Sequence, residues 1–165
     1  MGAWFDDIFP YVAAKIHPEC FGTLAGLEAI DIAWDAQSDL EEARATGEEC
    51  TIATYDYFKY FDSFCHYFTK KLLLHMGLPP RLVNIMFNVW TQSKRTIRQG
   101  GALGQPFHTP NGLGQGDVTS LLPALLLVSW QFYYIDHVMP GIAKGAYIDD
   151  RNFRASFQKL MSLHH

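Results

Sequence analysis

The chain has 165 residues, which is the length of one domain or of a large part of one. Apolar residues make up 48% and charged residues 18%, a composition that supports a packed core and excludes global disorder. The formal net charge of -4 counts against a strongly basic nucleic-acid-binding domain, although it leaves room for a local basic patch.

The cysteines and the hydropathy indicate the compartment of the protein and its relation to membranes. Cys20, Cys50 and Cys65 are odd in number and irregularly spaced, which indicates a reducing compartment rather than a disulfide framework. The most apolar stretch, residues 121–135, is short for a membrane span and contains Pro123. We therefore expect a buried core helix there and no membrane association.

The first 49 residues predict helical structure. Residues 1–23 are apolar and aromatic without a clean period, so we expect irregular structure with a short helix. Residues 24–47 carry apolar side chains at helical spacing, with a polar, acidic second half and Gly47 as a stop. The simplest explanation of the acidic run is a solvated helix face.

A strand and two helices follow. Residues 50–57 are rich in β-formers, which predicts a strand with Asp56 near its carboxyl end. Asp62 and Ser63 are an N-cap signal for a helix over residues 64–75. Prolines at 79 and 80 then open a second helix over residues 81–90, whose apolar residues form one stripe.

Glycines dominate the next part of the chain. Residues 94–99 and 106–109 flank a glycine-rich turn and predict a hairpin. Its compact basic cluster of Lys94, Arg95 and Arg98 is either a solvated strand face or a phosphate contact.

A second glycine-rich stretch, residues 111–117 (NGLGQGD), precedes a long apolar helix predicted over residues 120–138. Such a loop can bind phosphate at a helix N-terminus, although for a lone motif an ordinary loop is the simpler explanation.

A tight hairpin over residues 145–155 is predicted to carry Asp149 and Asp150 at its tip, and residues 157–165 begin a further helix. Two adjacent carboxylates repel each other unless a cation lies near them, and hard oxygen ligands suit Mg2+ or Mn2+. Taken alone, the pair is more simply explained as a solvated turn.

Three segments in this order resemble motifs A, B and C of reverse transcriptases: residues 56–63 (DYFKYFDS), 112–120 (GLGQGDVTS) and 147–150 (YIDD). Residues 77–80 (GLPP) and the hairpin that contains Gly101 are similar to the non-long-terminal-repeat retroelement and group II intron branches. The resemblance covers residues 50–155 well and residues 21–47 loosely. One motif alone would be weak evidence, whereas three in order at suitable spacings make a strong case.

The resemblance implies an α+β fold, a polymerase palm-like antiparallel sheet backed by helices. Residues 1–165 would form a single partial reverse-transcriptase domain. It would consist of a helical region adjoining the fingers (1–49), the palm (50–155) and the start of a truncated helix (156–165). Fingers and thumb segments of a longer polyprotein would be missing, so we expect the chain alone to be an incomplete or inactive polymerase.

The implied activity is RNA-directed DNA polymerase, a nucleotidyltransferase that uses two Mg2+ or Mn2+ ions. Asp56, Asp149 and Asp150 would be its catalytic residues and metal ligands, because in-line phosphoryl transfer uses two metals about 3.5–4 Å apart. Partners would be an RNA template, a DNA primer and deoxynucleoside triphosphates, and localisation would be nuclear.

The substrate-binding residues implied by the resemblance come from all three motifs. Phe61 would lie under the incoming sugar, although a core aromatic is a close alternative. Gln115 would contact the nucleotide, Gly114 and Gly116 would allow close backbone approach, and Tyr147 would support the primer or template.

Departures from the family pattern keep other hypotheses open. Gly114 and Leu121 stand where the family usually has proline, and Arg151 stands where it has an apolar residue. A degenerate polymerase-like fold that serves as a non-catalytic nucleic-acid-binding or interaction module is the main alternative. An RNA-dependent RNA polymerase and a fold with coincidental motifs are the others.

Overall fold

The computed structural model describes residues 2–22 and 26–164. It is an α+β structure with two compact units, which we describe separately. The sheet unit comprises Met1–Phe58 and Ala124–His165, and the insert unit comprises Lys59–Pro123. The expectation of a single partial domain stays a prediction.

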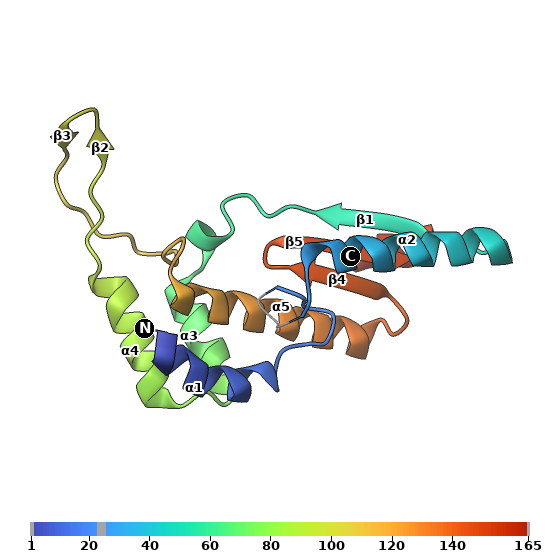
Figure 1. Ribbon diagram of the computed structural model, residues 1–165, viewed down its shortest axis with the longest axis horizontal. Helices are drawn as coiled ribbons and strands as arrows, with labels where there is room; N and C mark the ends of the chain where they lie inside the picture. The colour runs from blue at the N-terminus through green and yellow to red at the C-terminus, as the bar shows by residue number, and fades with distance from the viewer. Residues whose placement is uncertain (1, 23–25, 165) are drawn as a thin grey trace. The chain divides into compact units, whose positions relative to one another are not determined.

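Three antiparallel strands form the sheet: β1 (Thr51–Tyr55), β4 (Ala143–Tyr147) and β5 (Asp150–Ala155), in the order β1-β5-β4 (Figure 1). The central strand β5 therefore pairs on both sides. Tyr55 pairs with Arg151, and Tyr147 pairs with Asp150.

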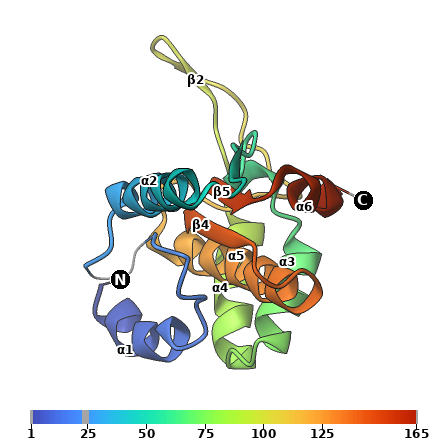
Figure 2. The same ribbon diagram turned by 90° about the vertical axis from the view of Figure 1, so that its right-hand side faces the viewer.

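Helices cover both faces of this sheet. Alternate residues of a strand point to opposite faces. On one face, Phe153 meets Phe132 of α5 (Val118–Val138), with ring centroids 5.8 Å apart. On the other face, Arg154 forms an ion pair of 2.5 Å with Asp39 of α2 (Ala29–Thr46). Figure 2 shows α2 and α5 on either side of β4 and β5.

The remaining elements of the sheet unit lie at its edges. α1 (Gly2–Ala13) precedes a segment that adds to β4: Phe21 N–H donates to Ala146 O at 2.8 Å, and Ala146 N–H donates to Glu19 O at 2.9 Å. α6 (Phe157–Met161) and a 3-10 turn (Ser162–His164) follow β5.

The insert unit is helical with a projecting ribbon. It contains a 3-10 turn (Phe61–Ser63), α3 (His66–His75) and α4 (Pro80–Gln92). A two-stranded ribbon of β2 (Arg98–Gln99) and β3 (Ala102–Leu103) follows. Its core is made of large apolar side chains with at most 7% exposure: Tyr60, Phe64, Leu72, Leu73, Leu78, Leu82, Val83, Met86, Phe87, Trp90, Leu113 and Leu122.

The sequence-based boundaries need three corrections. α1 extends over 12 residues, where irregular structure with only a short helix was expected. Asp62 and Ser63 do not cap α3, because they form the 3-10 turn and the N-cap is Cys65. The turn of the ribbon is only Gly100–Gly101. The second helix was expected to start at residue 24, which lies outside the described residues. In the described part of the chain, α2 begins at Ala29.

Within the part of the chain that the structure describes, no helix has both the length and the hydrophobicity of a membrane span.

Candidate active site

The turn between β4 and β5 consists of Ile148 and Asp149. Ile148 has φ 59°, a conformation that β-branched residues rarely adopt. A close neighbour holds this turn: a Cβ added to Gly22 would lie 2.9 Å from the backbone nitrogen of Ile148 and 3.0 Å from its Cγ1. The absence of a side chain at Gly22 therefore lets the chain pack directly against the strained turn.

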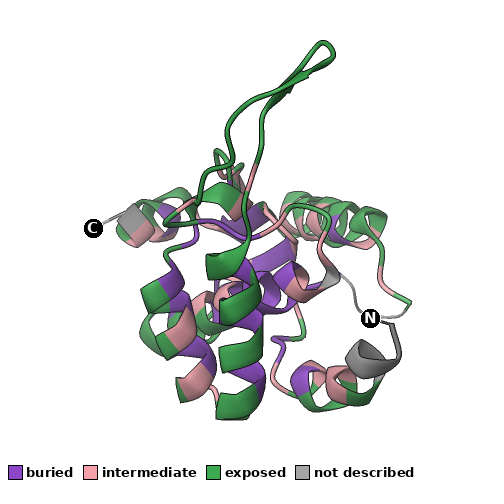
Figure 3. Cartoon of the chain, turned by 90° about the vertical axis from the view of Figure 1, so that its left-hand side faces the viewer, coloured by how far each residue is buried: buried purple, intermediate pink, exposed green. Residues whose placement is uncertain are grey.

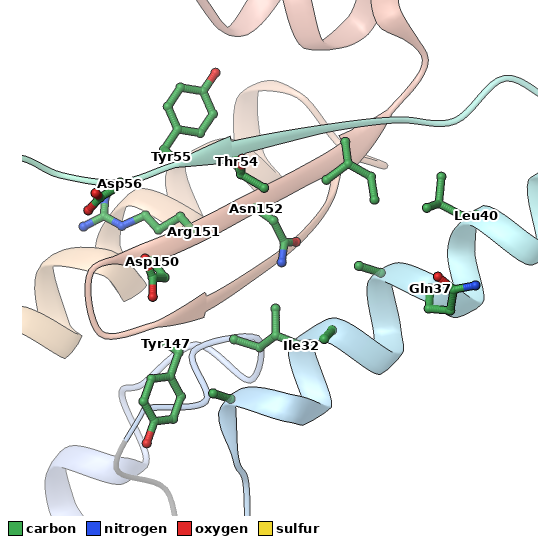
Figure 4. Close-up of a pocket in the computed structure, with 14 residues that line it drawn as sticks. Ile32, Gln37, Leu40, Thr54, Tyr55, Asp56, Tyr147, Asp150, Arg151 and Asn152 are labelled. Atoms are coloured by element: carbon green, nitrogen blue, oxygen red, sulfur yellow. The ribbon is translucent and has the colours of Figure 1, made fainter.

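Strand register brings Asp56 and Asp150 to the same face of the sheet. Tyr55 pairs with Arg151, so the next residue, Asp56, comes alongside Asp150 at the end of the ladder. Tyr147 pairs with Asp150 from the other side. These three side chains line one cavity of about 620 Å3 (Figure 4). Of the described residues, Asp149 is not among those that line it.

Small residues of α2 leave the space that this cavity occupies. Alanines face the sheet where larger side chains would fill the gap, and the charged side chains of Asp56, Asp150 and Arg151 lie together at one end. The lining comprises Ala29, Ile32, Ala33, Ala36, Gln37 and Leu40 from α2, with Ile52, Thr54, Tyr55, Asp56, Tyr147, Asp150, Arg151 and Asn152 from the sheet and its ends.

Arg151 brings a cation to the same cavity. Its side chain is buried, its guanidinium lies 4.0 Å from the centroid of the Tyr57 ring, and it donates a hydrogen bond to Gln131 of α5. A fixed positive charge among the lining residues lowers the affinity of the carboxylates for a metal ion.

The carboxylates near the cavity suit Mg2+ only in one mode of binding. Among the described residues, no group of three or more His, Cys, Asp or Glu side chains could hold a metal ion. Mg2+, however, is commonly bound in polymerase sites through one or two carboxylates, with waters and substrate phosphates completing its shell. Asp56 and Asp150 fit that mode, whereas a cage of three carboxylates is not formed by these residues.

The nucleotide-binding residues expected from motifs A and B lie in the insert unit. Phe61 and Gly116 line a small cavity of about 90 Å3 with Asp117 and Leu121. Two hydrogen bonds of 2.8 Å tie this loop to its own unit, from Leu113 N–H to Phe61 O and from Gly112 N–H to Phe64 O.

Backbone conformation and close packing explain why residues 112–117 contain glycines. Gly116 has φ 80°, in the left-handed region that favours glycine. A Cβ on Gly114 would lie 3.3 Å from Asp117 Cβ, so the loop is tight where the family usually has proline. Gln115 is exposed.

The predicted site residues thus fall into two sets. The sheet unit holds Asp56, Tyr147, Asp149 and Asp150, and the insert unit holds Phe61, Gly114, Gln115 and Gly116. Each set is gathered within its own unit, and the joining of the two sets stays a prediction.

A polar network behind the hairpin was missed by the sequence analysis. His17 and Lys144 are both 4% exposed. His17 Nε2 lies 2.8 Å from Asp136 Oδ2, and Lys144 donates to Asp136 and lies 2.9 Å from Glu19 Oε2. Glu19 N–H donates to His17 Nδ1, so Nε2 of a neutral ring would carry the proton. These residues are too far apart in the chain for any spacing signal.

Two pKa values reflect this environment. Partial burial raises the pKa of Asp136, but hydrogen bonds from Lys144 and His17 outweigh it, so the net pKa is lowered. Burial raises the pKa of the neighbouring Cys20 thiol to about 12, despite a hydrogen bond from Ser129. The Cys20 thiol is therefore protonated and unreactive at neutral pH.

Two solved structures of telomerase are similar in fold to this chain. A structure of apo telomerase from Candida tropicalis, truncated from its C-terminal domain, matches with a TM-score of 0.68 and 10% identity. A structure of telomerase from the same organism, in complex with the TWJ fragment of telomeric RNA, matches with a TM-score of 0.68 and 11% identity. The chain has a reverse-transcriptase-like fold.

The likeness covers 97% and 96% of this chain but only 36% and 29% of the two telomerase chains. At this level of identity it shows the fold alone. No protein-family model and no curated protein sequence matches the chain.

Proposed function

We propose that this chain is the palm portion of an RNA-directed DNA polymerase of a retroelement, of the non-long-terminal-repeat or group II intron-like branch. The observation that carries the proposal is the convergence of Asp56 and Asp150 on one cavity, from strands whose ends are far apart in sequence. The fold is similar to that of telomerase, and in sequence the segments that carry these residues resemble motifs A and C.

The residues divide the work of nucleotide addition. Asp56 and Asp150 would hold the divalent cations, with Asp149 from the turn beside them. Two bound Mg2+ or Mn2+ ions would activate the primer hydroxyl and stabilise the leaving pyrophosphate. Tyr147 borders the same cavity and would support the primer or template. Catalysis would then rest on positioning and charge neutralisation.

Residues of the insert unit would select the nucleotide. Phe61 would contact the sugar and exclude a 2'-hydroxyl, Gln115 would contact the nucleotide, and Gly114 and Gly116 would allow close backbone approach. The complete polymerase would act in the nucleus on an RNA template, a DNA primer and deoxynucleoside triphosphates. Because the chain spans about a third of the telomerase chains, we expect no steady primer extension from it alone.

Mn2+ binding tests the site without requiring turnover. We expect the purified chain to bind Mn2+, as measured by the loss of the free-ion signal in electron paramagnetic resonance. Asp56→Asn and Asp150→Asn should each weaken binding by tenfold or more, because each removes a ligand charge from the cavity. Asp39→Asn on α2 is the matched control, since Asp39 pairs with Arg154. Equal Mn2+ binding by all four proteins would contradict the proposal.

Arg151 favours a second candidate function, a non-catalytic nucleic-acid-binding or interaction module. A buried guanidinium beside Asp56 and Asp150 can neutralise the carboxylates in place of a metal ion. If the chain binds nucleic acid but no Mn2+, this candidate replaces the polymerase.

A further inference from the structure

Charge is divided unequally between the two units. The insert unit carries seven basic residues and two acidic ones, whereas the sheet unit carries six basic residues and fifteen acidic ones. Between Asp62 and Asp117 there is no acidic residue at all, and six lysines and arginines lie in that interval. The overall charge of -4 therefore conceals a basic unit with a formal charge of +5.

Three of the seven basic residues of this unit, Lys94, Arg95 and Arg98, lie on and beside the β2–β3 ribbon. In Figure 1 the ribbon projects beyond α3 and α4 of its own unit, and Figure 3 shows it exposed along almost its whole length. Lys94 and Arg98 are exposed, and neither forms an ion pair within the described residues. Arg95 lies at the base, with a partly exposed ion pair of 3.5 Å to Asp62.

Apolar residues alternate with these cations. Arg98 pairs with Leu103, which is 72% exposed, and Arg95 bridges to Phe107, which is 41% exposed. Ile97, between the two arginines, is 66% exposed. An isolated two-stranded ribbon is marginally stable in water, so exposed apolar side chains on it indicate a surface that a partner covers.

We propose that the β2–β3 ribbon, residues 93–108, is a binding arm for single-stranded nucleic acid. Lys94 and Arg98 would contact successive phosphates, and Phe107 would stack on a base. The proposal shares with the proposed function the expectation of a nucleic-acid partner, but it requires neither metal ions nor Asp56 and Asp149. It assigns binding to the ribbon, whose basic cluster the sequence analysis left as either a solvated strand face or a phosphate contact.

Fluorescence anisotropy with a labelled oligouridylate of about 20 nucleotides tests the arm, in EDTA so that no metal contributes. The test variant is Lys94→Gln with Arg98→Gln. Its matched control removes two cations from the sheet unit, Lys15→Gln with Arg44→Gln. A third variant, Phe107→Leu, keeps an apolar side chain but removes the aromatic ring. Circular dichroism confirms that each variant is folded.

We expect the double ribbon variant to reduce the slope of log K against log salt by about 1.4, which is about 0.7 for each lost contact to a single strand. At about 0.1 M salt this corresponds to about fivefold per contact and 25-fold for the pair. Phe107→Leu should weaken binding about fivefold without changing the slope. The control pair should bind as the unchanged chain does.

Three results would overturn the arm. The first is failure of the unchanged chain to bind at low salt, and the second is binding by the ribbon variant as tight as that of the control. The third is binding of polyglutamate as tight as that of the oligonucleotide, with no effect of Phe107→Leu on either, which would assign the ribbon to an acidic protein. Loss of Mn2+ binding with retained oligonucleotide binding would refute the polymerase while leaving the arm intact.

Discussion

At the residue scale, the charge of Arg151 distinguishes a metal-binding site from a site that has lost metal binding. Arg151 lines the same cavity as Asp56 and Asp150, and a positive charge near the site opposes a divalent cation by Coulomb repulsion. Arg151→Met should therefore tighten Mn2+ binding about tenfold, or about 1.4 kcal/mol.

Stability should fall in the same variant by about 1–3 kcal/mol, because Gln131 loses its hydrogen-bond partner. Arg154→Met is the control. It removes a buried cation from the same strand, and Mn2+ affinity should not rise in it. If Arg151→Met leaves Mn2+ affinity unchanged, the cation does not compete for the site.

Cys20 gives a residue-scale test of the packing behind the hairpin. Burial raises the pKa of its thiol to about 12, so at about pH 8 almost none of it is thiolate. We expect a disulfide reagent to titrate two thiols in the folded chain, Cys50 and Cys65, and a third only after denaturation. Cys20→Ser should leave the native count at two, and a native count of three would contradict this packing.

The turn and the segment that supports it are coupled at the element scale. Gly22→Ala places a Cβ against the backbone of Ile148, which cannot move without disturbing the strained turn. We expect destabilisation by about 1–3 kcal/mol in urea unfolding. Gly101→Ala is the matched control, because a Cβ at Gly101 meets nothing within 4 Å; its stability should change by less than about 0.5 kcal/mol.

Elements were predictable wherever a local pattern specifies them. β-formers ending at Asp56 predicted β1, and the prolines at 79 and 80 predicted α4, to within one or two residues at each end. The start of α3 was misplaced because Asp62 and Ser63 satisfy a 3-10 turn instead of a helix cap. Local capping signals cannot distinguish these two outcomes.

Long-range contacts were predictable only through the motif resemblance. The pairing of β1 with β5 joins residues about a hundred positions apart, and no local signal encodes it. The His17, Asp136 and Lys144 network was not predicted for the same reason. The charge division between the units could have been read from the sequence, but its meaning required the unit boundaries.

Charge division also governs the stability of the whole molecule. The sheet unit has fifteen acidic residues against six basic ones, so its compact state is destabilised by self-repulsion. Raising NaCl from about 0.05 to about 0.5 M shortens the Debye length from more than 10 Å to about 4 Å. We therefore expect the temperature at which Cys20 becomes reactive, which reports the sheet unit, to rise by several degrees.

Magnesium separates this general screening from binding at the candidate site. About 10 mM MgCl2 has the ionic strength of about 30 mM NaCl, so screening alone predicts equal shifts in the two salts. If Asp56 and Asp150 bind the ion, Mg2+ stabilises the folded state further by mass action. The extra shift should disappear in Asp56→Asn and persist in Asp39→Asn. Equal shifts in the two salts for the unchanged chain would mean that Mg2+ acts on the acidic unit only as a counterion.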